Sequence, residues 1–355
     1  RSSQPESRSV FRAGHSRVLK QGRFSVGSLC GEWYNEHRCK SARTKIYWNR
    51  IFPSDSKKRM ATNCVNWDDS EELFGWAKFR NFPKTVNVMP APILNLSDPT
   101  KICETLLQAT ELLFSYEGRV GSTHHIPPEG NALVSGDLHD SPLHLAKIIK
   151  LAALHEPTNH VVLQELIHSG DTHNVHDYSY QMLARVAALV VSYPLQVHPI
   201  LANHELSQVT GRAITKGGSE LVEGFLHGVD HVFGNEADSV LSAISAFVYA
   251  MPLAVRSKSG LMCCHSLPNE ALMDAFDMDV IDRELLPEDV RGGDGSAHMM
   301  VWGRQHTREQ IDMLAAYWGV KLFCLGHAWV PEGVDVAMDK VVHINSDHDN
   351  GAVLL

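Results

Sequence analysis

Downstream of about residue 121, short apolar runs alternate with amphipathic stretches, and this alternation predicts an α/β core. Runs of four to eight apolar residues predict strands, and apolar residues spaced three and four apart predict helices. The expected strands cover residues 132–135, 160–167, 197–201, 253–257, 261–264 and 321–325, with further short strands near Val334, Val341 and Val353. The expected helices cover residues 141–155, 178–193, 220–227, 237–250 and 307–318.

The chain before residue 121 divides into two parts of different character. Residues 1–59 hold 14 Lys and Arg against 4 Asp and Glu, are rich in Ser and lack helical or strand periodicity. We interpret them as a basic extension, disordered or non-native; a targeting segment, or sequence upstream of a start at Met60, are the alternatives. Residues 60–120 are predicted to form a helical adaptor. Its main helix follows a cap at Ser97 or Asp98 and has an apolar face of Ile102, Leu106, Leu107, Leu112 and Leu113.

Polar clusters follow the predicted strands at the points where these strands end. Ligands of α/β proteins bind at the carboxyl ends of strands, so the clusters are candidates for one common site. Carboxylate, imidazole and amide groups predominate in them, and these are ligands for divalent metal ions. The five clusters are Gly136-Asp137-Leu138-His139, Gly170-Asp171, Asn203-His204-Glu205, Cys264-His265 and Gly326-His327.

In order and spacing, these clusters resemble the motifs of the calcineurin-like metallophosphoesterases, and in particular of the phosphoprotein phosphatase branch and its bacterial relatives. The family motifs GDxHG, GDxxDRG, GNHE, a strand-end His and a late GH correspond here to GDLHD, GDTHN, ANHE, CCHS and LGHA. The resemblance spans about residues 130–345. It implies a metallophosphoesterase domain over residues 121–355, with two mixed β-sheets packed face to face and flanked by helices.

The resemblance also implies roles for individual residues. Two divalent ions, Mn, Fe, Zn or Co, would lower the pKa of a bridging water, and the resulting hydroxide would attack phosphorus. His204 would be the general acid that protonates the leaving oxygen. The implied ligands are Asp137 and His139 for the first ion, Asp171 for both ions, and Asn203, His265 and His327 for the second. Arg304 is the best candidate for a phosphate contact and is also counted as catalytic, with Arg212, Lys216 and His173 as further substrate-binding candidates.

Several positions depart from the family pattern. Ala202 replaces the Gly of GNHE, which would be strained if the turn there needed a positive φ. Two arginines that grip phosphate in phosphoprotein phosphatases are missing. Asn174 is the nearest match to the Asp that pairs with the catalytic His. A phosphoprotein or a nucleotide therefore remains open as substrate, and a degenerate protein that binds metal or phosphorylated partners without turnover is the alternative.

Composition bears on the partners of the protein, on membrane segments and on the cellular compartment. The 355 residues carry a formal net charge of −9, which argues against a general nucleic-acid binder. No apolar run approaches the roughly 20 residues that cross a bilayer, so no membrane segment is expected. Seven scattered Cys suit free thiols in the cytoplasm better than a disulfide framework. The acidic stretch 347–349 lacks the spacing of a calcium-binding loop and is interpreted as a hairpin turn. The sequence does not define an oligomeric state.

Overall fold

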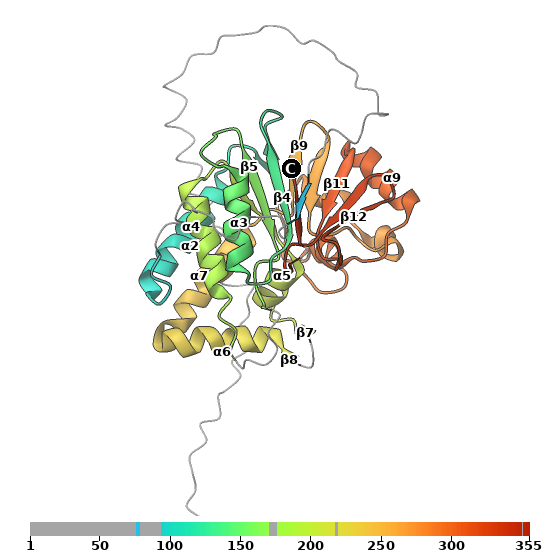
Figure 1. Ribbon diagram of the computed structural model, residues 1–355. Coiled ribbons are helices and arrows are strands. Elements are labelled where there is room, and N and C mark those ends of the chain that lie inside the picture. Colours follow the sequence, from blue (N-terminus) through green and yellow to red (C-terminus); the bar gives the residue numbers. More distant parts are fainter. Residues whose placement is uncertain (1–75, 79–93, 170–175, 217–218, 350) are drawn as a thin grey trace, which may run out of the picture. The chain divides into compact units, whose positions relative to one another are not determined.

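Two mixed β-sheets form the centre of the protein (Figure 1). The computed structural model describes residues 76–78, 94–169, 176–216, 219–349 and 351–355. In the first sheet three neighbouring strands are parallel, and two more continue the sheet in antiparallel pairing. Its order is β1 (Trp76–Lys78), β14 (Ala352–Leu354), β4 (Ala132–Asp137), β5 (His160–Gln164) and β6 (Val197–Pro199).

The second sheet mixes parallel and antiparallel neighbours in the same way. Its order is β12 (Val334–Ala337), β13 (Val341–Ile344), β11 (Leu322–Leu325), β10 (Leu261–Cys264), β9 (Ala254–Ser257), β3 (Thr123–Ile126) and β2 (Arg119–Val120). A separate two-stranded ribbon pairs β7 (Thr215–Lys216) with β8 (Ser219–Glu220).

The two sheets pack face to face through apolar side chains that both contribute. Val134 and Val162 of the first sheet lie in one buried cluster with Val255, Cys263 and Cys324 of the second. Burial of such side chains is the main favourable contribution to folding, at about 25 cal/mol per Å² of apolar surface. The predicted α/β class, with two mixed sheets packed face to face, is confirmed.

Helices cover the outer faces of this sandwich. Figure 1 shows α2, α3, α4 and α7 grouped beside the first sheet and α9 beside β11 and β12 of the second. Within the described residues, no helix has the length and apolar character needed to cross a membrane. The α-helices are α2 (Pro99–Phe114), α3 (Pro142–Ala152), α4 (Tyr180–Ser192), α5 (Asn203–Thr210), α6 (Leu221–Phe233), α7 (Ala237–Ala250), α8 (Ser296–Trp302) and α9 (Arg308–Trp318).

The predicted helix after Asp98 is present as α2. The Asp98 carboxylate accepts a hydrogen bond from Lys101 N and so satisfies one of the free amides of the first turn. The helix packs against α4 and α7, and Ile102 and Leu106 are buried, whereas Leu107, which was predicted on the same face, is 38% exposed. Residues 1–59 and most of 60–93 lie outside the described residues, so the predicted domain boundaries stay predictions.

The predicted core strands are present, but β2 and β3 were not predicted, and β5 and β6 end before their predicted ends. β5 stops at Gln164, three residues before the predicted end of the strand, although Leu166 and Ile167 are as deeply buried as the strand itself. Glu165 has φ 45, which breaks the extended backbone at that point. The residue that directly follows β5 is therefore Glu165, five positions before Gly170.

Three buried histidines form a chain of contacts away from the strand ends that carry the polar clusters. His198 Nδ1 lies 3.2 Å from His124 Nδ1, and His198 Nε2 lies 3.1 Å from His160 Nδ1. Burial, together with the neighbouring His160, lowers the pKa of His198 to about 3. The folded protein therefore resists protonation of His198 far below the usual titration range of histidine.

Acid is expected to destabilise the protein partly through His198. Between the ordinary histidine pKa of about 6.5 and the folded value of about 3, the unfolded chain binds a proton that the folded chain rejects, so stability falls as pH decreases. From pH 7 to pH 5 this group alone costs about 2 kcal/mol. We expect His198→Gln to lose about that much less stability over this interval in urea titrations with chelator present. The exposed His155→Gln is the control, and an equal pH dependence of wild type and His198→Gln would refute the assignment.

Candidate metal centre

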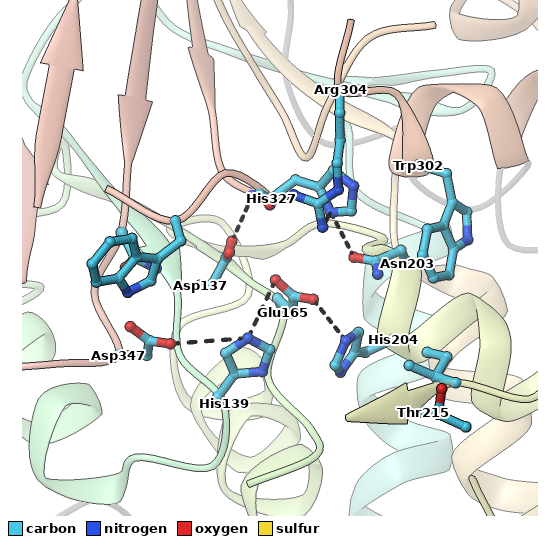
Figure 2. Close-up of a pocket in the computed structure, with 13 residues that line it drawn as sticks. Asp137, His139, Glu165, Asn203, His204, Thr215, Trp302, Arg304, His327 and Asp347 are labelled. Carbon is cyan, nitrogen blue, oxygen red and sulfur yellow. Dashed lines mark hydrogen bonds and ion pairs between the residues drawn. The ribbon is translucent and has the colours of Figure 1, made fainter. Parts of the chain in front are cut away.

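The predicted strand-end residues converge on one pocket of about 430 Å³ (Figure 2). Asp137 ends β4, and His139 follows two residues later. Asn203 and His204 are the first two residues of α5, so consecutive side chains leave the helix in different directions. His265 follows β10 and lies fully buried beside the pocket residues. The predicted residues that line the pocket itself are Asp137, His139, Asn203, His204, Arg304 and His327.

Glu165, which the sequence analysis did not select, lies between these side chains. Its carboxylate oxygens are 3.7 Å from His139 Nε2, 3.3 Å from His204 Nε2 and 3.7 Å from His265 Nε2. Among the described residues, two groups can hold a metal ion, His139-Glu165-His204 and Glu165-His265-His327, and both include Glu165. The predicted bridging residue Asp171, as well as His173, lies outside the described residues.

Asn203 and Asp137 hold the two histidines of the second group in place. Asn203 Oδ1 is 2.6 Å from His265 Nε2 and 3.1 Å from His327 Nδ1. His327 N donates to Asp137 Oδ1 at 2.9 Å. A Cβ on Gly326 would lie only 2.3 Å from that same carboxylate oxygen, so the Gly before His327 permits this close approach.

Backbone strain concentrates at this site. Of the eight non-glycine residues with positive φ in the described ranges, His139, Glu165 and His327 line the pocket, Asp140 follows His139, and His168 contacts His204. Each such conformation costs of order 1 kcal/mol or more and persists only when the surrounding structure enforces it. These backbone conformations lower the stability of the fold and fix the orientation of the side chains, a combination that is typical of functional sites.

Burial shifts the pKa values of the site in opposite directions for acids and bases. It raises the pKa of Asp137 to about 6, and burial together with the charge of Asp137 raises the pKa of Glu165 well above its usual value. Burial, with nearby Arg304, lowers the pKa of His327 to about 3, and burial with nearby His327 lowers that of His265. The imidazoles of His265 and His327 are therefore neutral at pH 7 and their lone pairs can bind metal.

These residues fit divalent metal ions. His327 Nε2 is buried and has no hydrogen-bond partner among the described residues, as expected of an atom that binds a metal ion. The Asp137 and Glu165 carboxyl groups interact in a buried position, where two negative charges repel unless a proton or a cation lies between them. Neutral imidazole, carboxylate and amide oxygen form a donor set for Mn, Fe, Zn or Co.

The predicted substrate-binding cationic residues differ in their position relative to the pocket. Arg304 lines the pocket and donates to His327 O at 2.5 Å. The Arg212 guanidinium instead contacts His298 Nε2 at 2.9 Å, and Arg212 is not among the residues that line the pocket. Lys216 belongs to β7, directly after the pocket residue Thr215, and its side chain is not described. Arg304 is thus the cation that the described structure brings to the site.

Comparison with known proteins agrees with this geometry. The family model of the calcineurin-like phosphoesterases matches residues 131–331, more than half of the chain. The chain belongs to the calcineurin-like phosphoesterase family. The chain therefore has phosphoester hydrolysis as its class of activity. Binding of divalent metal ions is typical of this family.

A solved structure resembles this calcineurin-like phosphoesterase in fold. A protein serine/threonine phosphatase from Saccharomyces cerevisiae, with similarity to human phosphatase PP5, superposes with a TM-score of 0.55 at 13% identity over 71% of this chain and 78% of that one. A cold-active protein-tyrosine phosphatase of a psychrophilic Shewanella gives a TM-score of 0.47 at 12% identity over 65% of this chain and 76% of that one. A search of curated protein sequences found no match.

Two departures of this phosphoesterase from the family pattern have a structural explanation. Ala202 has φ −121, so the backbone does not need a glycine there and the substitution carries no strain. His204 Nδ1 contacts His168 Nδ1 at 3.1 Å, and His168 Nε2 contacts Gln208 Oε1 at 3.0 Å. A histidine therefore packs behind His204, where the sequence suggested Asn174, which lies outside the described residues.

Proposed function

We propose that this phosphoesterase hydrolyses phosphate esters with two divalent metal ions that share the Glu165 carboxylate, and with His204 as the general acid. The observation that carries the proposal is the position of Glu165, which belongs to both groups of potential ligands. Asp137 and His139 would hold the first ion with Glu165. Asn203, His265 and His327 would hold the second with it. Asp171, which the motif comparison suggests for the shared position, is the competing candidate.

The bound ions would supply Lewis acidity and lower the pKa of a water molecule toward neutrality. The protein residues position the ester for attack. The Arg304 guanidinium carries a permanent positive charge, and its planar donors match two oxygens of a phosphoryl group. It lies next to His327 and donates to the His327 carbonyl oxygen, so the residue proposed to bind phosphate also contacts the loop that carries a proposed metal ligand.

His204 is oriented for proton transfer by the residues behind it. Gln208 Oε1 accepts from His168 Nε2, which leaves His168 Nδ1 to accept the proton of His204 Nδ1. His204 Nε2 then faces the pocket, beside Glu165 Oε1 at 3.3 Å (Figure 2). A proton on this nitrogen could be transferred to the leaving oxygen of the ester.

The substrate of this proposal is a phosphorylated protein or nucleotide, and the metals are Mn, Fe, Zn or Co. The buried thiols of Cys263, Cys264 and Cys324 support a reducing compartment, the cytoplasm. Binding without turnover is less well supported, because Ala202 is unstrained and His168 contacts His204.

A phosphatase assay across metals tests the proposed function. We expect the purified protein to contain about two divalent ions per chain and to hydrolyse p-nitrophenyl phosphate. Chelator should abolish the activity, and addition of Mn²⁺ or another of the four ions should restore it, because the ligand set is neutral imidazole and carboxylate. Bound metal without turnover under any of the four ions would contradict catalysis and support a binding protein.

A further inference from the structure

The loop after β13 is fastened to the end of β4, where the first metal ligand is. Ser346 Oγ accepts a hydrogen bond from Gly136 N at 2.9 Å and donates to Ala352 O at 2.6 Å. Ser346 N donates to Asp137 O at 3.2 Å, and Asn345 pairs with Asp137 in an isolated β-bridge. The next residue, Asp347, therefore has a fixed position beside the site.

The Asp347 carboxylate points into the pocket toward His139 (Figure 2). Asp347 Oδ2 lies 4.0 Å from His139 Nε2, and Glu165 Oε2 lies 3.7 Å from the same nitrogen. Asp347 Oδ1 is buried and has no hydrogen-bond partner among the described residues. A carboxylate with an unpaired buried oxygen is costly unless a cation or a donor binds it.

The three atoms that face one another here are His139 Nε2 and one oxygen from each of the Glu165 and Asp347 carboxylates. His139 Nδ1 faces Ile167 O at 3.4 Å, and in the tautomer that donates to this oxygen the Nε2 lone pair is directed toward the two carboxylates. A lone pair and two carboxylate oxygens repel one another when no positive charge lies between them. Two ligands of one ion, each about 2.1 Å from it, lie roughly 3 to 4.2 Å apart. The distances of 3.7 and 4.0 Å fall within this range.

We propose that Asp347 is a further ligand of the first metal ion. This inference rests on the proposed function and extends it. Without Asp347, the first ion would have three protein ligands, namely Asp137, His139 and Glu165, whereas the second ion would have four. With Asp347, the first ion would have four protein ligands. The hairpin turn that the sequence predicts at residues 347–349 would then have a chemical role as well as a structural one.

Metal binding by Asp347→Asn tests this inference, with Asp349→Asn as the matched control. Asp349 lies in the same turn, is exposed and does not line the pocket. We expect Mn²⁺ titrations of Asp347→Asn to show one of the two sites weakened at least about tenfold. Asp349→Asn should keep both sites. The electron paramagnetic resonance spectrum of the coupled Mn²⁺ pair should give way to that of a single ion in Asp347→Asn at limiting metal.

Each result has a distinct meaning. Two sites of unchanged affinity in Asp347→Asn would overturn the inference and leave the proposed function intact. Equal weakening of metal binding in both variants would also overturn it, because the effect would then come from the loss of any negative charge in this turn. A wild-type protein that binds one ion would overturn the inference and the two-metal proposal together. Thermal unfolding with chelator shows whether Asp347→Asn folds, since without metal the variant should be at least as stable as wild type because one of the two facing negative charges is removed.

Discussion

Glu165→Gln is expected to remove most of the bound metal and to lower the rate of p-nitrophenyl phosphate hydrolysis by about 10³-fold. The glutamine keeps the shape of the side chain but removes the charge that offsets the repulsion of two divalent ions, and loss of the metals forfeits several kcal/mol of catalysis. Elemental analysis of the purified variant and the initial rate under saturating Mn²⁺ measure the two effects.

Asp171→Asn is the matched comparison, because the motif comparison selects Asp171 for the same role. The proposed arrangement requires a smaller loss of metal in Asp171→Asn than in Glu165→Gln. The reverse order, with two ions retained in Glu165→Gln, would return the shared position to Asp171. Unfolding in chelator should be no less cooperative for Glu165→Gln than for wild type, since burial already raises the pKa of Glu165 and disfavours its charge.

His204→Asn is expected to lower the rate for alkyl phosphates by about 10² to 10⁴-fold, which is the usual contribution of general acid catalysis. The loss for p-nitrophenyl phosphate should be much smaller, because this leaving group departs without a proton. Metal content should change little, since Asn203 and not His204 is the proposed ligand. Steady-state kinetics with both esters, together with elemental analysis, measure these effects.

Equal losses for the two leaving groups would argue that His204 positions the substrate instead of protonating it. Loss of one ion would argue that it is a ligand, which is a real alternative because His204 belongs to the potential metal-binding group with His139 and Glu165. The two alternatives predict different metal contents, so one preparation of the variant distinguishes them.

Most of the strands could be predicted because each buried strand is a short apolar run that ends at a polar cluster. The same reasoning placed the end of β5 too late. Residues 161–163 and 166–167 are apolar and buried on both sides of Gln164 and Glu165, so hydrophobicity does not mark where the strand stops. The positive φ of Glu165 is invisible in the pattern, and Gly170-Asp171 offered a closer match to the family motif.

A signal for Glu165 did exist in the sequence. An ionisable carboxylate inside an apolar run is rare among buried residues unless it is paired or binds metal. Weighing that improbability above the Gly-Asp match would have selected Glu165. The contact of His168 with His204 had no such signal, because it depends on the tight turn after β5 that brings two distant segments together.

The position of β14 has a consequence for how the enzyme folds. β14 lies between β1 and β4, and the clamp from Ser346 to Gly136 joins residues 210 positions apart in the chain. Contacts this distant in sequence slow folding, because a large loop must close before they form. A ribosome would release β4, β5 and β6 long before residues 352–354, so one edge of β4 stays unpaired during synthesis and can pair with other chains. The proposed ligands at the end of β4 would consequently be among the last parts of the site to reach their final positions.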